Sequence, residues 1–209
     1  MNSGFAFDLG EWFDSNAAKI QQNLKRYFDG NEGDRFTGRW FEDFAAMGHP
    51  DRYEASDLVA IEALSVRVPT ESAGRLLVTE ADRFNELLAE IPGGVDIWDV
   101  PRSVVDPASA AAQLHSALKT LEDVGYVTAG KLLAAKRPRL IPILDWKVES
   151  LLAPPRDQFW VTMHDQLIDG PRREVIAGVC AAAPPGVSLL RRIDVALWMH
   201  VTAGLQKRT

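Results

Sequence analysis

Cysteine and long apolar runs are the two features that this chain of 209 residues has least of. A single cysteine, Cys180, cannot form an intrachain disulfide, and four scattered histidines do not complete a cysteine-rich zinc or iron–sulfur site. No stretch approaches the roughly 20 apolar residues of a membrane span, and residues 1–11 lack the basic and apolar regions of a signal peptide. We therefore expect a cytoplasmic protein with no metal, no other cofactor and no membrane partner.

Positive charge is also scarce. The chain holds 23 Lys and Arg against 29 Asp and Glu, a net charge of −6, which argues against a strongly basic nucleic-acid-binding protein. The acids are concentrated in residues 1–124, which hold 22 of them against 11 cations, whereas residues 125–209 hold 7 acids against 12 cations. The objection from net charge therefore applies mainly to the N-terminal part of the chain.

The alternation of apolar and polar residues that marks a half-buried strand is nearly absent. Apolar residues recur instead at helical spacing, so the sequence predicts an all-α bundle of about nine helices. At most one minor β pairing is expected, between residues 65–69 and 76–78. We expect a single helical domain, or one with two lobes formed by an acidic N-terminal part, residues 1–104, and a C-terminal part, residues 105–209.

Helix boundaries are predicted from turn residues and from side chains that can accept from first-turn N–H groups. A helix over residues 11–28 should stop at Asp29-Gly30, and a later helix should follow Gly125. The predicted helix starts are Ser56 or Asp57, Thr79 with Asp82, Asp106 before Pro107, and Asp145.

Residues 121–152 carry the most specific pattern in the chain. They predict a helix, a tight turn around Gly125, a second helix, a proline-bounded loop and a short helix that Asp145 caps. The N–H groups at such a turn and helix start can bind a phosphate without any basic side chain. The loop would then bring one carboxylate next to that phosphate.

This segment resembles the helix-hairpin-helix DNA glycosylase superfamily. The family pattern Val-Gly-x-x-Thr-Ala is present from Val124 to Ala129, Asp145 follows Thr128 by 17 positions, and the apolar Val148 comes three residues after Asp145. The whole chain is also similar to an uncharacterised actinobacterial family of similar length. The glycosylase resemblance implies an all-α glycosylase-like fold, DNA as the partner, and Asp145 as the catalytic group.

In that family the carboxylate stabilises the oxocarbenium-like sugar while the base leaves, and it orients a water molecule. The hairpin and the cations near it would contact the DNA backbone; the lysines near a helix C-terminus equally fit a solvated face. The candidate DNA-binding residues are Val124, Gly125, Val127, Thr128, Lys131, Lys136, Arg137, Arg139 and Lys147.

Three departures from the family pattern limit what the resemblance implies. Glu122 and Asp123 replace its Pro and first Gly, so the left-handed turn position falls on Asp123 and two carboxylates lie near the phosphate site. Val127 occupies the position of the lysine that strand-cleaving members use as a nucleophile. The family's C-terminal cluster cysteines are absent from this chain.

Three interpretations therefore remain open. The protein is a monofunctional base-excision glycosylase, or a catalytically silent interaction or regulatory protein of the same fold without DNA binding, or an unrelated helical protein whose motif is coincidental. In the silent form, Asp145 would serve only as a helix cap, and the groove would be filled by Trp146 or Phe159.

Other singled-out residues have structural explanations. Trp146, Phe159 and Trp160 could stack on an extruded base, but aromatic residues at helical spacing are typical of a core. Asp194 lies on the apolar stripe of the last helix, where an ion pair with Arg191 or Arg192 is expected.

Overall fold

The computed structural model describes residues 7–30 and 36–206, and every regular element in them is a helix. The all-α prediction is therefore confirmed for this part of the chain. The predicted β pairing is wrong, because residues 76–78 lie in a π-helix, η2 (Arg75–Thr79), and residues 65–69 form a turn and a loop. Leu76 is fully buried in this helix, so its apolar character reflects a helical core position.

The described residues form twelve α-helices, more than the nine or so predicted. The expected helix over residues 11–28 is divided at Asn16 into α1 (Leu9–Ser15) and α2 (Ala17–Asp29). Asn16 donates from Nδ2 to the carbonyl of Trp12 at 2.8 Å, a local bond that competes with helix continuation. The short helix α5 (Thr70–Gly74) was not predicted.

Helix boundaries agree with the prediction at some positions and differ at others. As expected, α2 stops at Gly30, and this residue adopts a left-handed conformation. Helix α4 (Ala55–Ala63) begins instead after Glu54, with Asp57 accepting from the Glu54 N–H inside a capping box, and α6 (Ala81–Ala89) begins after Glu80 without a side-chain cap. Helix α7 (Ala110–Leu118) is capped by Ser109 rather than by Asp106, whose side chain accepts from the Ala108 N–H in the preceding turn.

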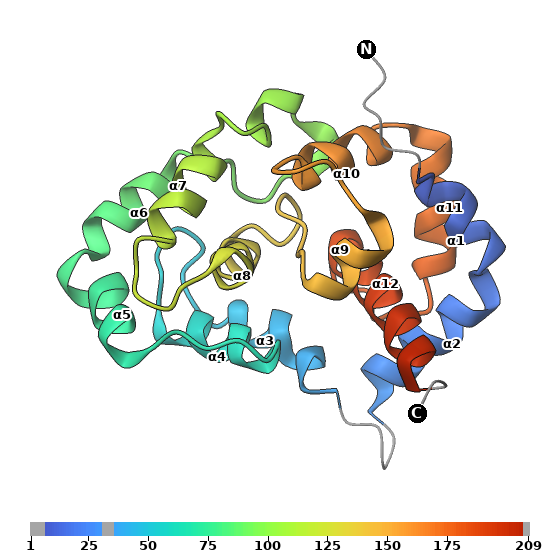
Figure 1. The fold of residues 1–209 in the computed structure, drawn as a ribbon, viewed down its shortest axis with the longest axis horizontal. Helices are drawn as coiled ribbons and strands as arrows, with labels where there is room; N and C mark the ends of the chain where they lie inside the picture. The colour runs from blue at the N-terminus through green and yellow to red at the C-terminus, as the bar shows by residue number, and fades with distance from the viewer. Residues whose placement is uncertain (1–6, 31–35, 207–209) are drawn as a thin grey trace. The chain divides into compact units, whose positions relative to one another are not determined.

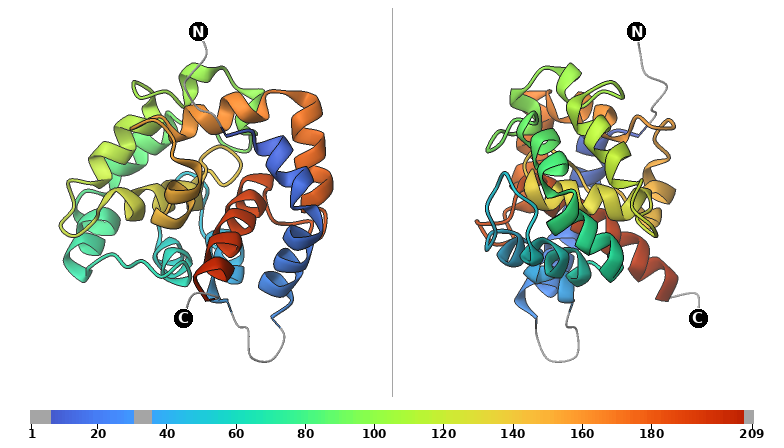
Figure 2. Two further views of the ribbon diagram at one scale, coloured as in Figure 1. Left: turned by 45° about the vertical axis from the view of Figure 1, so that its right-hand side comes forward. Right: turned by 90° about the vertical axis from the view of Figure 1, so that its left-hand side faces the viewer.

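Unit 1 consists of residues 1–36 and 144–209. It contains α1 and α2, α9 (Trp146–Leu152), α10 (Phe159–Leu167), α11 (Gly170–Cys180) and α12 (Leu189–Gln206). Helix α12 packs on α2 and α9, and α11 packs on α1; Figure 2 shows the red C-terminal helix beside the blue N-terminal ones. The predicted ion pair is confirmed, because Arg191 and Asp194 are both buried and bonded to each other.

Unit 2 consists of residues 37–143. It contains the short helix η1 (Thr37–Trp40), α3 (Phe41–Ala45), α4, α5, η2, α6, the short helices η3 (Ile97–Asp99) and η4 (Arg102–Val104), α7 and α8 (Tyr126–Lys136). Helices α3, α4 and α7 all pack against α8 (Figure 1). Alanines at positions 129, 134 and 135 are buried on α8, and such small side chains permit close approach of its neighbours.

The two units divide the chain after residues 36 and 143, not at residue 104. Neither unit is basic, since unit 1 holds 12 Lys and Arg against 13 Asp and Glu, and unit 2 holds 11 against 16. In the described residues, no helix is long and apolar enough to cross a membrane, and no group of three or more His, Cys, Asp or Glu side chains could hold a metal ion.

Candidate functional site

The predicted hairpin is formed in unit 2 by α7, a turn over residues 119–125, and α8. Asp123 adopts a φ of 56°, so the left-handed position falls on this residue as predicted. Val124 is buried under the turn, and the Ser72 hydroxyl donates to the Glu122 carbonyl at 2.8 Å. These contacts hold the turn against the rest of unit 2.

Gly125 is the N-cap residue of α8 and is exposed. Its φ of −82° is open to any residue, and an added Cβ would meet no atom within 4 Å. Neither the backbone nor the packing of the turn therefore requires glycine here. Because glycine has no side chain to cap the helix, the first N–H groups of α8 begin at an uncovered turn, where an anion could approach closely.

Two side chains at this turn escaped the sequence reasoning. Lys119 is exposed directly after α7, and its ammonium lies 5.8 Å from the ring centroid of Tyr126, which is 38% exposed. Glu122 and Asp123 are exposed on the same turn, so its charge is mixed. A lysine just beyond a helix end, followed by an aromatic residue after the turn glycine, is the signal that could have identified this pair.

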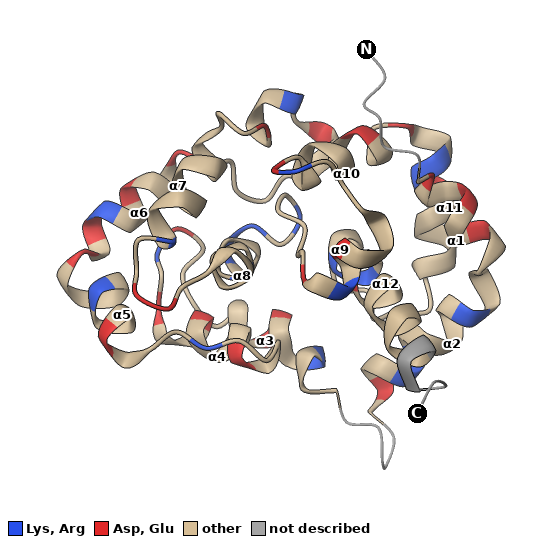
Figure 3. Ribbon diagram, in the orientation of Figure 1, with Lys and Arg blue, Asp and Glu red and all other residues tan. Residues whose placement is uncertain are grey.

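The cations predicted to face DNA from α8 lie inside unit 2. Lys131, Lys136 and Arg137 are all at most 6% exposed, and the Lys131 ammonium donates to the Leu64 carbonyl at 3.0 Å. They lie neither on an exposed DNA-facing surface nor on a solvated face, because α3, α4 and α7 surround α8. Lys136 is the last residue of α8 and Arg137 follows it; Figure 3 shows blue at this end of the helix and in the loop after it. Thr128 is likewise buried, and Val127 is half-buried.

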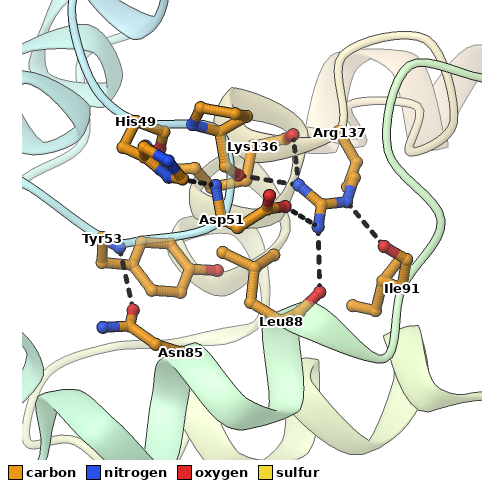
Figure 4. Close-up of polar contacts among 9 residues, drawn as sticks. His49, Asp51, Tyr53, Asn85, Leu88, Ile91, Lys136 and Arg137 are labelled. Carbon is orange, nitrogen blue, oxygen red and sulfur yellow. Dashed lines mark hydrogen bonds and ion pairs between the residues drawn. The ribbon is translucent and has the colours of Figure 1, made fainter.

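Arg137 joins three segments of unit 2 (Figure 4). Its guanidinium donates to the carbonyls of Leu88 and Ile91, both at 2.9 Å, and to the Pro50 carbonyl and the Asp51 carboxylate, both at 2.8 Å. A fifth bond goes to the carbonyl of Lys136. All five donors of the side chain are therefore used inside the protein.

Lys136 forms a buried ion pair with Asp57, with 2.6 Å between Nζ and Oδ2, and also donates to the His49 carbonyl at 2.9 Å. Burial raises the pKa of Asp57, and the bond from Lys136 acts against this shift. Tyr53 is also buried, which raises the pKa of its phenol, and among the described residues its Oη has no hydrogen-bond partner. Gly48 packs closely against Lys136, since a Cβ added at position 48 would lie 3.3 Å from Lys136 Nζ and 2.7 Å from Ser56 Oγ.

Arg139 is half exposed and binds the Asp96 carboxylate through both Nε and Nη2. It also donates to the Gly94 carbonyl at 3.3 Å. A bidentate pair with a carboxylate occupies the geometry with which arginine would bind a phosphate.

Asp145 caps α9 in unit 1, as predicted. Its Oδ1 accepts from the N–H groups of Lys147 at 2.9 Å and Val148 at 3.1 Å. Among the described residues, Oδ2 accepts no hydrogen bond, and the side chain is half-buried. One oxygen of this carboxylate therefore serves the helix while the other stays available.

The aromatic residues after Asp145 differ in how far they are buried. Phe159 is buried, as predicted for a core residue, and Trp160 is half-buried. The core prediction is wrong for Trp146, the first residue of α9, which is 61% exposed. Lys147 donates to Thr202 Oγ1 at 3.0 Å, and its ammonium lies 4.0 Å from the ring centroid of Trp198.

Two comparisons with known proteins find nothing: no curated protein and no solved structure matches the chain. A third comparison finds a family model that matches residues 20–201, which is most of the chain and parts of both units. The chain therefore belongs to that family, the family of unknown function DUF6308.

Proposed function

We propose that this protein binds DNA as a helix-hairpin-helix glycosylase-type protein and acts as a monofunctional base-excision glycosylase. The observation that carries the proposal is the divided role of Asp145. Its Oδ1 holds the start of α9, whereas Oδ2 has no partner among the described residues. Capping and catalysis are therefore compatible in the same side chain.

The hairpin supports DNA as the partner. The Val124-Gly125 turn leaves the start of α8 without a side-chain cap, and neither backbone nor packing requires glycine at position 125. A glycine that the fold does not need allows a phosphate to reach the backbone N–H groups. Because neither unit is basic, binding would depend on this local contact and on Lys119 more than on long-range electrostatic attraction between the protein and DNA.

In the proposed reaction the N-glycosidic bond breaks and its electron pair leaves with the base. The Asp145 carboxylate stabilises the positive charge that develops on the sugar, and water then adds to the anomeric carbon. The proton lost by that water balances the charge on the departing base. Val127 stands where a lysine nucleophile would be needed, so no Schiff base and no strand cleavage are expected.

A second candidate is the silent interaction protein of the same fold. It is favoured by the burial of Lys131, Lys136 and Arg137 and by the exposed carboxylates of Glu122 and Asp123 at the turn. Each of these observations weakens attraction to phosphate.

Binding is tested with a short duplex that carries an abasic-site analogue, at low and at physiological salt. We expect salt-dependent binding that Lys119→Glu weakens by about 10-fold, because a lysine near a phosphate is replaced by an acid. Lys25→Glu, the same charge change on an exposed lysine of α2, serves as the control. If the wild-type protein does not bind at low salt, the silent interpretation replaces the proposal.

Catalysis is tested by base release from a panel of damaged duplexes. Asparagine caps a helix as well as aspartate does. Asp145→Asn should therefore keep the fold and the affinity but lower the rate of base release by about 100-fold or more. Asp169→Asn, at the N-cap of α11, is the matched control and should change neither. Equal rates for the two variants would exclude Asp145 as the catalytic group.

A further inference from the structure

We propose that Trp146 is the surface on which the extruded nucleobase stacks in the DNA complex. This inference rests on the proposed function and adds a positioning residue to it. The ligand is the flat face of a base that has left the duplex, and the neighbouring group is the Asp145 carboxylate.

The exposure of Trp146 is the first observation. A tryptophan side chain offers more apolar area than any other residue, so leaving 61% of Trp146 in water forgoes much of the gain from burial. The chain has six tryptophans, and two of them, Trp146 and Trp40, are exposed. Of these two, only Trp146 adjoins a carboxylate with an available oxygen.

The position of Trp146 is fixed by the residues on either side. Asp145 caps the helix that begins with this tryptophan, so the start of the helix is held by two hydrogen bonds. Lys147 lies with its ammonium 5.6 Å from the Trp146 ring centroid and 4.0 Å from that of Trp198 on α12. A cation held near both indoles, and bonded to Thr202, links the start of α9 to α12.

The chemistry of these three side chains fits a nucleobase. An indole face stacks on the π-face of any base, a contact worth about 1–3 kcal/mol per base. Asp145, the residue before Trp146 in the chain, has an Oδ2 without a partner among the described residues. A base that stacks on Trp146 would thereby bring its sugar towards the carboxylate that the proposed reaction uses.

The experiment compares two duplexes of equal charge, one with a single unpaired thymidine and one with an abasic analogue at the same position. We expect the wild-type protein to prefer the thymidine duplex by about 10-fold, and Trp146→Ala to lose this preference while binding the abasic duplex normally. Trp146→Phe should keep most of the preference. Trp40→Ala, which removes the other exposed tryptophan, should keep it fully.

Fluorescence provides a readout that a purely structural role would not change. Stacking of the base should quench part of the indole emission in the wild-type protein and in Trp40→Ala, but not in Trp146→Phe. Thermal unfolding of each variant establishes that it is folded. If Trp146→Ala keeps the preference, loses both duplexes equally, or the wild type shows no preference, the stacking role is wrong and DNA binding stands. If the wild type binds neither duplex, both proposals are wrong.

Discussion

Arg137 illustrates how the surroundings of one residue decide its role. In the sequence it stands in a basic segment that favours a phosphate contact, but in unit 2 its donors bind carbonyls from the end of α6 and from the loop over residues 49–51. These acceptors would lose their partners together if the guanidinium were removed.

We therefore expect Arg137→Met to lower the free energy of unfolding by about 3–5 kcal/mol, because several buried acceptors and the Asp51 carboxylate lose their partner. Arg139→Met is the matched control and should cost at most about 1 kcal/mol, since its pair with Asp96 is half exposed. Urea denaturation of both variants measures the difference. Equal losses would show that the buried network adds nothing.

For Tyr53, unlike Arg137, we expect the loss of a polar group to change the stability little. Its hydroxyl is buried without a partner among the described residues, so Tyr53→Phe removes a polar atom and leaves the ring in place. We expect the unfolding free energy to change by less than about 1 kcal/mol, in either direction. Asp57→Asn, which leaves Lys136 buried beside a neutral group, should cost several times more. A loss above about 2 kcal/mol for Tyr53→Phe would reveal a partner of its hydroxyl.

Helix ends are the features of single elements that the sequence predicts best, because a cap depends on residues close in the chain. Asp145 and Gly30 were found from such local signals. At α4 the signal was misplaced, because Asp57 lies inside the first turn and also binds Lys136, which is 79 positions away in sequence. The local pattern identified the residue, but its full role depends on a distant partner.

Asp8, the N-cap residue of α1, stabilises this helix in a pH-dependent way. The bond from the Glu11 N–H, together with Arg172, lowers the pKa of Asp8. A lowered folded-state pKa means that the stabilisation is present above the ordinary pKa, near 4, and is lost as the pH falls through the folded-state value.

Asp8→Ala should therefore cost about 1 kcal/mol at neutral pH, the typical value of a side-chain cap, and nearly nothing in acid, where the wild-type cap is also lost. Asp14→Ala, an exposed acid on the same helix, should change stability by less than about 0.5 kcal/mol at either pH. Urea denaturation at both pH values tests this. A pH-independent loss for Asp8→Ala would contradict the assigned cap charge.

At the scale of the whole molecule, the chain forms unit 1 from its two ends and unit 2 from one continuous segment, residues 37–143. Unit 2 contains its own core, with Phe41, Phe84, Leu88 and Leu114 fully buried. The network of Arg137 and the Asp57–Lys136 pair also lie wholly within this segment.

We expect a fragment of residues 37–143 to fold on its own, because a domain with a continuous chain and an internal core meets the conditions for independent folding. Its far-UV circular dichroism should be helical, and it should unfold cooperatively with urea. Arg137→Met in the fragment should cost as much as in the full chain. An unfolded fragment would show that unit 2 requires unit 1.

The sequence by itself determined the helical class, the hairpin turn with its left-handed Asp123, and the cap at Asp145, because spacing, turn preference and capping act over a few residues. Only the tertiary structure decided which side chains meet solvent. Lys131, Lys136 and Arg137 are internal because neighbouring helices surround α8, whereas Trp146, expected in the core from its helical spacing, is 61% exposed. Burial depends on residues far apart in the chain, and no local pattern contains that information.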